Sequence, residues 1–445
     1  MLHKVLIANR GEIALRVMRA CRDLDIASVV IFSEADRDSL PVRLADEAVC
    51  IGPAPSSKSY LSIPNIISAA LITGCDAVHP GYGFLAEDRY FAEICGEYNL
   101  TFIGPPAGVI ARMANKAEAR REMEAAGLPI LPGTESSVTT LEEAQAAARR
   151  IGYPVMLKAA AGGGGRGMVV AHDDNDLSQG FNLARVEARA AFDDDEVYVE
   201  RYLRRCRHIE VQVLADSYGK VIHLAERECS IQRRHQKIIE EGPCRSITDD
   251  VRRGLGSCAV QGASRLGYVG AGTMEFLVDA AGDFYFLEMN SRIQVEHGVT
   301  ELVTGVDIVK EQILIAAGHP LSMRQEEVQI SGHAIECRVT AEKGPDFRPA
   351  TGTVEDLVLP GGPGIRVDSH LYSGYRMPAH YDSLLAKIMA HGRSREEAMA
   401  RMRRALADTI IAGVPTTLPF LTEVLRDPAF CSGQVYTDYV ASRAL

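Results

Sequence analysis

Two glutamates, Glu275 and Glu288, stand in a stretch of sequence whose pattern predicts a β-hairpin. The stretch GTMEFLVDAAGDFYFLEMN contains two strand-like apolar runs joined by a turn signal. A hairpin centred between Ala281 and Gly282 places the glutamates opposite each other, with Cβ atoms roughly 4.5–5.5 Å apart, where like charges repel. A hard cation such as Mg²⁺, which takes oxygen ligands and substrate phosphates, would turn this repulsion into a binding site. The alternative is a surface hairpin with solvated glutamates and a register one residue off.

Polar residues then alternate with apolar ones in EMNSRIQVEHGVTE, residues 288–301. In an extended segment every second side chain points to the same face. A solvated strand face rarely combines so ordered a polar set with apolar alternates. The pattern therefore favours a functional face that begins at Glu288, the glutamate in the second strand of the predicted hairpin. The polar residues of this face are Glu288, Asn290, Arg292, Gln294 and Glu296.

A glycine-rich loop follows Lys158, which ends an apolar strand-like run. Because glycine has no Cβ, the backbone N–H groups of such a loop can approach an anion closely. The lysine precedes the glycines and a strand follows them, so the loop is neither a Walker A motif nor a dinucleotide fingerprint. The pattern predicts a flap over nucleotide phosphates, with a disordered surface hairpin as the alternative. The loop consists of Gly162, Gly163, Gly164, Gly165, Arg166 and Gly167.

Positive charge is concentrated in QRRHQK, residues 232–237, with apolar isoleucines on both sides. Charge runs are usually solvated faces, but the flanking isoleucines predict that part of this run is buried. A buried cluster of positive charge needs anions beside it.

The composition excludes several classes of protein. The 445 residues predict two to three domains, and 47% apolar with 24% charged residues is typical of a globular protein. The longest apolar runs are too short for a bilayer and the N-terminus turns charged too early for a signal peptide. Ten cysteines without a C-x-x-C pair fit a reducing cytoplasm, and a net charge of −11 argues against nucleic-acid binding.

The order of predicted elements indicates an α/β region followed by an α+β region. A β-α-β rhythm over about the first hundred residues predicts a doubly wound parallel sheet. A small unit with strands at 153–159, 168–171 and 196–202 follows, and then long antiparallel strands at 209–215 and 221–225. Helices are predicted at 116–126, 141–151 and 395–407.

Six motifs, in this order along essentially the whole chain, resemble the biotin carboxylase family of ATP-grasp enzymes. They are KVLIANRGEIALR, HPGYGFLAE, KAAAGGGGRGM, QRRHQK, EMNSRIQVEH and ECRV. The resemblance implies an N-terminal doubly wound domain (1–114), an ATP-grasp domain (115–330) with a small mobile lid (about 131–203), and a C-terminal domain with a mixed or antiparallel sheet (331–445).

The same resemblance implies that ATP phosphorylates bicarbonate to carboxyphosphate, whose CO₂ then carboxylates biotin. Mg²⁺ or Mn²⁺ is expected on Glu275, Glu288 and Asn290. The residues expected to bind ATP are Lys116, Lys158, Gly162, Gly163, Gly164, Gly165, Arg166, Gly167, Glu200, Arg201, Leu203, His208, Gln232, His235, Glu275 and Glu288.

By the same resemblance, Glu296 is the general base, Arg338 stabilises the biotin enolate, and Lys237 and Arg292 complete the catalytic set. The residues expected to bind bicarbonate or biotin are Tyr82, Lys237, Arg292, Gln294, Val295 and Arg338.

No lysine stands between two methionines, as it does in biotin acceptors, so the biotin is expected on a separate carrier protein. A separate carboxyltransferase is expected as well. The default acceptor is acetyl-CoA, in fatty-acid synthesis, with propionyl-CoA or pyruvate as alternatives. A cytoplasmic homodimer is expected, with its interface at Arg16, Arg19, Asp23 and Arg366.

Four positions depart from the family pattern. Ala114-Asn115 replaces a Gly-Asp or Gly-Ser pair, Gly298 replaces a proline, Lys343-Gly344 replaces Asp-Pro, and Pro363 replaces an aromatic residue at the expected interface. Since glycine loosens the backbone that proline fixes, Glu296 is expected to be held less rigidly.

Two other functions stay open. A ligase that resembles carbamoyl phosphate synthetase would share the lysines, the glycine loop and the glutamate pair, but would not need Tyr82 or Arg338. A non-catalytic paralogue that binds nucleotide and regulates a complex has only the four departures in its favour.

Overall fold

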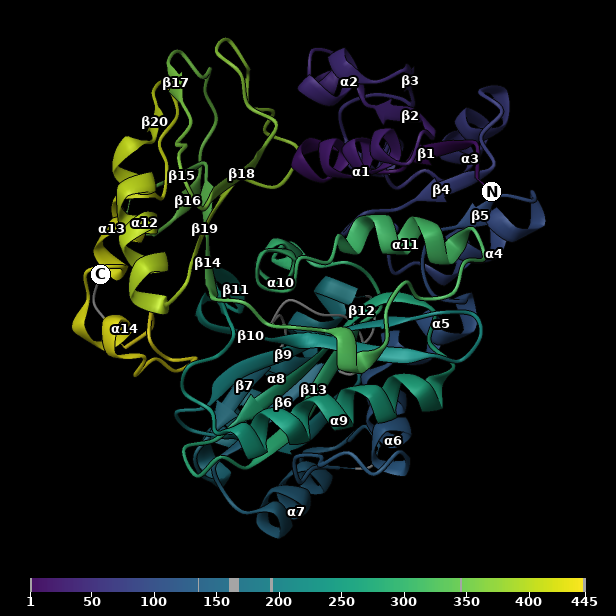
Figure 1. Ribbon diagram of the computed structural model, residues 1–445. Coiled ribbons are helices and arrows are strands. Elements are labelled where there is room, and N and C mark those ends of the chain that lie inside the picture. The colour runs from purple at the N-terminus through teal and green to yellow at the C-terminus, as the bar shows by residue number, and fades with distance from the viewer. Residues whose placement is uncertain (1, 135, 160–167, 193–194, 345, 443–445) are drawn as a thin grey trace.

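The computed structural model (Figure 1) describes residues 2–134, 136–159, 168–192, 195–344 and 346–442. The predicted phosphate flap at 162–167 therefore lies outside the described residues. No helix in the described part of the chain is both long and apolar enough to span a membrane.

The N-terminal part contains a five-stranded parallel sheet in the order β3–β2–β1–β4–β5, as the doubly wound prediction requires. After β1 the chain moves toward one edge of the sheet, and after β4 it moves toward the other edge, so a topological switch point lies between these two strands. Ligands bind beyond the carboxyl ends of the strands at such a point. Glu12 follows β1 there, and Tyr82 follows β4. The strands are β1 (Lys4–Ile7), β2 (Ala27–Phe32), β3 (Glu47–Cys50), β4 (Ala77–His79) and β5 (Thr101–Phe102).

Helices connect these strands. The long helix α1 buries most of its side chains, because apolar residues recur along it at helical spacing. The helices are α1 (Gly11–Asp23), α2 (Leu40–Leu44), α3 (Ile63–Ile72), α4 (Arg89–Glu97) and α5 (Ala107–Ala114), with short 3-10 turns η1 (Glu34–Asp36) and η2 (Ser56–Lys58).

A second, small antiparallel sheet has the order β7–β6–β8 and carries its own apolar core. It lies in the range expected for the lid. Helix α7 begins with a capping box, in which Thr140 and Glu143 satisfy each other's backbone N–H groups. The elements are α7 (Leu141–Ile151), β6 (Val155–Ala159), β7 (Met168–Ala171), α8 (Asp174–Phe192) and β8 (Val197–Arg201).

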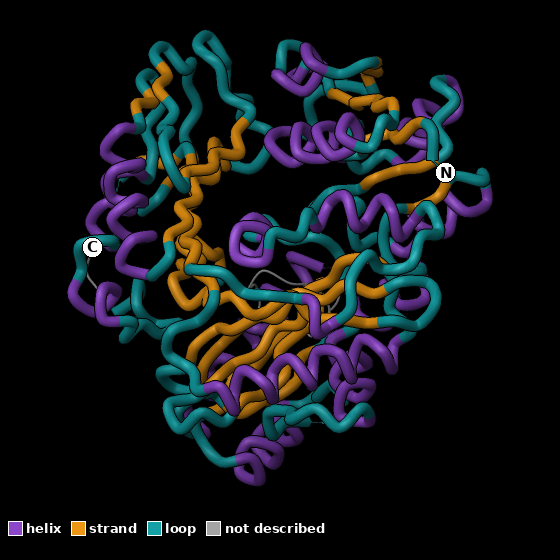
Figure 2. The backbone as a smooth tube through the Cα atoms, viewed as in Figure 1, coloured by secondary structure: helices purple, strands orange, loops and turns teal. Residues whose placement is uncertain are grey.

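An eight-stranded antiparallel sheet forms the centre, in the order β13–β12–β9–β10–β11–β14–β19–β18. Figure 2 shows its strands running from the middle of the molecule into the C-terminal part. Since β11 pairs with β14, one sheet continues across the domain boundary predicted at 330. The strands are β9 (Arg207–Ala215), β10 (Val221–Arg233), β11 (Gln236–Gly242), β12 (Gly270–Val278), β13 (Phe284–Asn290), β14 (His333–Thr340), β18 (Ile365–Ser369) and β19 (Leu384–Gly392).

The remaining elements are helical, apart from four short strands that pair as β15–β16 and β17–β20 in two separate sheets. They are α6 (Lys116–Ala125), α9 (Asp249–Leu266), α10 (His297–Thr304), α11 (Ile308–Ala316), α12 (Arg395–Asp408), α13 (Leu418–Val424), α14 (Pro428–Ser432), η3 (Gln325–Glu327), β15 (Glu342–Lys343), β16 (Arg348–Pro349), β17 (Leu357–Val358) and β20 (Ile410–Ile411).

Two sequence predictions about strands need correction. The strand predicted at 221–225 continues to Arg233, because a bulge at Ala225, whose φ is +66°, interrupts the apolar pattern without ending the strand. The extended segment predicted from Glu288 to Glu296 ends at Asn290, and a helix begins at His297.

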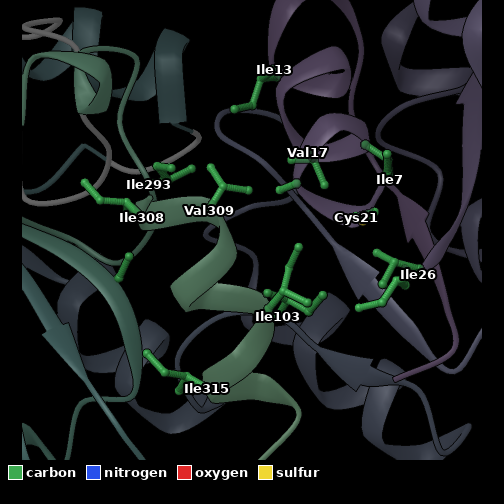
Figure 3. Packing of buried hydrophobic residues seen from close by; sticks show 14 of the residues in the cluster. Ile7, Ile13, Val17, Cys21, Ile26, Ile103, Ile293, Ile308, Val309 and Ile315 are labelled. Atoms are coloured by element: carbon green, nitrogen blue, oxygen red, sulfur yellow. The ribbon is translucent and has the colours of Figure 1, made fainter. Parts of the chain in front are cut away.

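A buried apolar cluster fixes the segment that leaves β13. Ile293 is fully buried, and Figure 3 shows it beside Ile308 and Val309 of α11, which packs against α1. This packing turns the chain away from the sheet after β13. It thereby anchors the segment 291–296, which carries most of the predicted polar face, between the N-terminal part and the central sheet.

Candidate active site

Lys237, on β11, lies among three buried carboxylates. Its ammonium donates to Glu275 on β12 at 2.8 Å, to Glu296 at 2.6 Å and to Glu210 on β9. Burial alone would lower the pKa of Lys237, but the carboxylates of Glu210 and Glu275 raise it well above its ordinary value. The positive charge predicted to be buried is therefore present, and the anions that it needs come from neighbouring strands.

The predicted pairing of Glu275 and Glu288 is confirmed. The prediction placed the turn centre half a residue too late: from Phe276 onward the register is centred on Ala281, and a register shift between Glu275 and Phe276 brings the two glutamates opposite each other. The shift matters because a bulge re-aims the side chains beside it.

The carboxylate of Glu275 is saturated with polar contacts. One oxygen accepts from Lys237, from Asn290 at 2.9 Å and from Gln294 at 2.7 Å, and the other lies 2.8 Å from His208 Nε2. Burial opposes ionisation, but the nearby charges of Lys237 and His208 hold the pKa of Glu275 well below its ordinary value. These charges favour the ionised form of the carboxylate.

Glu288 stands in different surroundings. Its side chain is 34% exposed, and its carboxylate lies 3.7 Å from the ammonium of Lys116, the first residue of α6. Asn115 caps that helix by accepting from the N–H of Glu118 at 3.0 Å, as an aspartate or serine would. The departure at Asn115 thus leaves the helix cap intact.

The alternating polar residues meet in one place although the segment is not a strand. Asn290 and Gln294 both donate to Glu275, and Arg292 donates to Asn290 at 2.9 Å. Glu87, from the N-terminal part, accepts from Arg292 at 2.9 Å and so orients its guanidinium. The residues of the shared face were predicted correctly, but the extended strand expected to carry them ends at Asn290.

Glu296 lies between two cations. It accepts from Lys237 at 2.6 Å through one oxygen and from Arg338 on β14 at 2.7 Å through the other. Burial by itself raises the pKa of this carboxylate, but Lys237 and Arg338 together hold it well below its ordinary value. Arg338 also lies 2.6 Å from Glu240 on β11, whose pKa burial raises to about 7 despite the guanidinium.

The residues expected around the nucleotide lie on the lid and the neighbouring strands. Lys158 at the end of β6 donates to Glu200 on β8, which also accepts from Arg120 at 2.9 Å. Gln232 pairs with Lys237 across β10 and β11, and the connecting two-residue turn contains His235. Burial and the charge of Lys158 lower the pKa of His235. Arg201 and Leu203 lie at and just beyond the end of β8.

Tyr82 lies at the switch point of the N-terminal sheet, where its hydroxyl donates to Glu12. Burial, and then the carboxylate of Glu12, raise the pKa of Tyr82 well above its ordinary value, so the hydroxyl stays protonated. A pocket near these residues is lined partly by Lys237, Arg338, Arg233 and Phe347.

The donor set at the hairpin fits a hard divalent cation. Glu275, Glu288 and the amide of Asn290 offer oxygen atoms, which are the ligands that Mg²⁺ prefers. Among the described residues, His208, Glu210 and Glu275 also form a group whose potential ligand atoms lie within 4.8 Å of one another, which adds a buried histidine and a further carboxylate. The Glu275–Glu288 pair therefore fits the predicted metal.

Several residues of the site escaped the sequence analysis. Glu210 was missed although His208, Glu210 and Gln212 alternate on β9 in the same way as the polar residues after β13. Arg227 on β10 is fully buried and donates to Glu210 at 2.5 Å and to Gln212 at 2.9 Å. The period-two argument could have found Glu210, whereas the partners of Arg227 depend on the fold.

Gly298 is tightly packed. A Cβ added there would lie 2.4 Å from the sulfur of Met389, a buried residue of β19. The methionine therefore occupies the space beside this glycine. The expectation that Gly298 leaves Glu296 loosely held finds no support, because Lys237 and Arg338 hold both carboxylate oxygens.

Three family models match the chain in succession. They are "Biotin carboxylase, N-terminal domain" at residues 1–110, "Carbamoyl-phosphate synthase L chain, ATP binding domain" at 115–324 and "Biotin carboxylase C-terminal domain" at 336–442. The chain is 51% identical over 442 residues to biotin carboxylase 1 of Bacillus subtilis, covering 99% of this chain and 98% of that protein.

Solved structures of similar proteins share the fold over the full length. The biotin carboxylase of Campylobacter jejuni, in a complex with β-γ-ATP, has a TM-score of 0.98 at 46% identity and covers 100% of this chain and 99% of its own. The biotin carboxylase domain dimer of the Hydrogenobacter thermophilus 2-oxoglutarate carboxylase, with MgADP, ADP and bicarbonate, has a TM-score of 0.96 at 47% identity and covers 99% and 98%.

Proposed function

Because the chain belongs to the biotin carboxylase family of ATP-grasp ligases, we propose that it carboxylates biotin with ATP and bicarbonate. One observation carries the proposal. The buried carboxylate of Glu296 lies between the ammonium of Lys237 and the guanidinium of Arg338, beside the Glu275–Glu288 pair. A base, two cations for anionic substrates and a metal-binding pair are thus within one small region.

The nucleotide occupies the side of the site formed by the lid. Lys116 and Lys158 contact its phosphates, and the glycine loop expected beside them lies outside the described residues. Lys158 binds Glu200 and the ammonium of Lys116 lies 3.7 Å from Glu288, so each ammonium group has a carboxylate partner that a phosphate can replace. The adenine and ribose contacts come from Glu200, Arg201, Leu203, His208, Gln232 and His235.

Glu275 and Glu288 hold the divalent cation, with Asn290 beside them. Bound there, Mg²⁺ supplies positive charge that neutralises the phosphate oxygens during transfer. Glu275 is fixed by Lys237, Asn290 and Gln294, so it provides a rigid ligand. Glu288 is half-buried and only loosely paired, so it is free to turn toward the ion.

Bicarbonate binds between Lys237, Arg292, Gln294 and Val295. Glu296 takes the proton from its hydroxyl, and the resulting oxygen attacks the γ-phosphorus of ATP, so that ADP leaves and carboxyphosphate forms. The low pKa of Glu296 depends on its two cations. When the substrate anion takes a share of these cations, the pKa of Glu296 rises and the carboxylate becomes a better base.

Biotin binds beside Arg338 and Tyr82. Carboxyphosphate breaks down to CO₂ and phosphate, the phosphate takes the proton from the ureido nitrogen of biotin, and this nitrogen attacks CO₂. Arg338 stabilises the negative charge that develops on the ureido oxygen. The guanidinium is held by Glu296 and lies against Glu240, so it is oriented before biotin arrives. This pre-orientation reduces the reorganisation needed in the transition state.

The biotin is carried on a separate carrier protein, and a separate carboxyltransferase passes the carboxyl group on. Acetyl-CoA, in cytoplasmic fatty-acid synthesis, is the acceptor that we favour, with propionyl-CoA and pyruvate as alternatives. Similar chains occur as the biotin carboxylase subunit of a pyruvate carboxylase and within a 2-oxoglutarate carboxylase, so the acceptor does not follow from this fold.

We propose that the protein acts as a homodimer, because the similar biotin carboxylase domain of the Hydrogenobacter thermophilus 2-oxoglutarate carboxylase is a dimer. Within one chain Arg16 and Arg366 both bind Glu301, at 2.8 and 2.7 Å, and Asp23 binds Lys310 at 2.7 Å. Arg19 is exposed on α1. Three of the four residues expected at the interface are thus held in place before a second chain docks.

The test is bicarbonate-dependent ATP hydrolysis by the purified chain, with and without free biotin, in the wild type and in Glu296→Gln. The exposed Glu326→Gln is the matched control. We expect biotin to stimulate turnover in the wild type and the control, and turnover to fall by about 100-fold or more in Glu296→Gln, since general bases contribute that much. Bicarbonate-dependent turnover that ignores biotin would instead favour a carbamoyl phosphate synthetase-like ligase, and nucleotide binding without turnover would favour a regulatory paralogue.

A further inference from the structure

Lys387, on β19, is a fully buried lysine at the junction of the three parts of the molecule. Its ammonium donates to the backbone carbonyl of Val295 at 2.8 Å and lies 3.2 Å from Glu12. Asp368 on β18 is 3.8 Å away. A buried ammonium is stable only where such acceptors surround it, so its position is fixed by them.

Glu12 links this lysine to Tyr82. The same oxygen, Oε1, that faces the ammonium of Lys387 also accepts the hydroxyl proton of Tyr82. Tyr82 and Glu12 follow neighbouring strands at the switch point of the N-terminal sheet. The ammonium is therefore one contact away from the Val295 backbone and two contacts away from the Tyr82 hydroxyl.

Lys387 and Arg338 act on consecutive residues from one face of the central sheet. They are direct partners in the pairing of β14 with β19, so their side chains share a face. Arg338 binds the carboxylate of Glu296 at 2.7 Å, and Lys387 binds the carbonyl of the residue before it. The two cations together fix both the backbone and the side chain at the base.

We propose that Lys387 is a positioning residue that holds the Val295 carbonyl and, through Glu12, the Tyr82 hydroxyl in a fixed relation to each other. The inference rests on the proposed function, in which Val295 and Glu296 serve bicarbonate and Tyr82 serves biotin. Lys387 contacts neither substrate. It acts through these residues and so connects the proposed bicarbonate site to the proposed biotin site.

The main test is Lys387→Met, assayed for the KM values of bicarbonate, biotin and ATP separately. Methionine keeps the unbranched apolar chain but removes the ammonium. We expect the KM values of bicarbonate and biotin to rise about tenfold or more, as the loss of a hydrogen bond to a buried charged group implies. The KM of ATP should stay within about twofold, because Lys387 acts on the residues proposed for bicarbonate and biotin. Uniform damage to the fold would instead change all three KM values.

Three further variants keep the test decisive. Lys387→Arg restores a positive donor and should recover part of the loss. Glu12→Gln keeps an oxygen for both donors but removes the charge, so it should raise the KM of biotin by a smaller factor, and it decides the matter if Lys387→Met does not fold. Lys58→Met, at an exposed position, is the matched control and should change nothing.

A fall in kcat alone, with all three KM values unchanged in both Lys387→Met and Glu12→Gln, would overturn the proposal, as would an equal rise in the KM of ATP. Failure of the proposed function looks different, because the wild type itself would then ignore biotin. In that case the Tyr82 half of the inference falls too, and the KM of bicarbonate in Lys387→Met alone decides whether the lysine positions Val295.

Discussion

The two opposed glutamates of the β12–β13 hairpin mark two regions of the site that are built differently. Around Glu275, the side chains of Lys237, Glu210, Glu296 and Arg338 form a buried network, called here the packed region. Around Glu288, a partly exposed carboxylate and the ammonium of Lys116 stand 3.7 Å apart, and these two residues are called the open region.

The two regions differ in how much the contacts between their charges matter for the stability of the fold. In the packed region the buried charges compensate one another directly, so removing one leaves the others buried and unpaired. In the open region solvent screens the charges, and their mutual contact contributes little to stability. Substitutions in the two regions should therefore differ more in their effect on stability than in their effect on activity.

The largest effect on stability is expected for Lys237→Met. It leaves Glu210, Glu275 and Glu296 without their shared cation, so the free energy of unfolding should fall by about 3–5 kcal/mol. Turnover should be abolished as well. Urea denaturation gives the free energy directly. A stability within about 1 kcal/mol of the wild type would mean that the packed region is not a structural unit, and the comparison would fail.

The next effect tests the packing at Gly298, two residues after Glu296 of the packed region. Gly298→Ala places a Cβ against the sulfur of Met389, so we expect a loss of about 1–3 kcal/mol from overpacking. Gly108→Ala in α5, where an added Cβ meets nothing within 4 Å, is the control and should be neutral or stabilising.

A double variant then separates packing from backbone effects. Gly298→Ala combined with Met389→Ala should be more stable than the sum of the single losses predicts, because the two changes relieve each other. Strict additivity would show that the glycine is needed for its backbone and not for the space beside it.

A smaller effect should appear as a dependence of stability on pH. Burial raises the pKa of Glu240 to about 7, so the folded protein holds a proton there that the unfolded chain has already released. This contribution is fully present below the ordinary pKa of a glutamate and is lost as the pH rises toward 7. In Glu240→Gln the wild-type decrease in stability between pH 5 and 8 should be smaller by on the order of 1 kcal/mol.

Thermal unfolding across that pH range, in wild type and variant, measures the difference. Glu326→Gln, an exposed carboxylate, should follow the wild-type curve. Parallel curves for wild type and Glu240→Gln would mean that Glu240 is ionised throughout, and that the packed region carries one more negative charge than we infer.

The sequence predicted the two regions unequally well. Period-two alternation and antiparallel pairing are local, so the hairpin could be predicted from its own sequence, although Glu275 and Glu288 come to lie opposite each other through a register shift between Glu275 and Phe276. The shared face of Asn290, Arg292 and Gln294 was found by the same argument, although tertiary contacts decide the backbone there. Ile293 enters the core between α1 and α11, and Ser291 donates to Glu87, so the chain leaves the sheet.

Other contacts had no local signal. Lys387 meets Glu12 across most of the chain's length, and Arg338 shares its guanidinium between carboxylates from two other segments. No periodicity within one segment encodes such contacts, because they depend on which strands are neighbours in the central sheet and on how the N-terminal part packs against it. The motifs that resemble the biotin carboxylase family supplied Arg338 and Tyr82, but they supplied neither Glu12 nor Lys387 as parts of the site.

The smallest effect on stability is expected in the open region. Glu288→Gln removes a carboxylate that is 34% exposed and 3.7 Å from its nearest cation, so the free energy of unfolding should change by less than about 1 kcal/mol. The Mg²⁺ concentration that supports half-maximal turnover should nevertheless rise about tenfold or more, because the ion loses a charged ligand. Titrating Mg²⁺ at saturating ATP, beside a urea curve of the same variant, measures both. A large loss of stability with an unchanged Mg²⁺ requirement would reverse the roles of the two regions, since Glu288 would then belong to the network that holds the fold together.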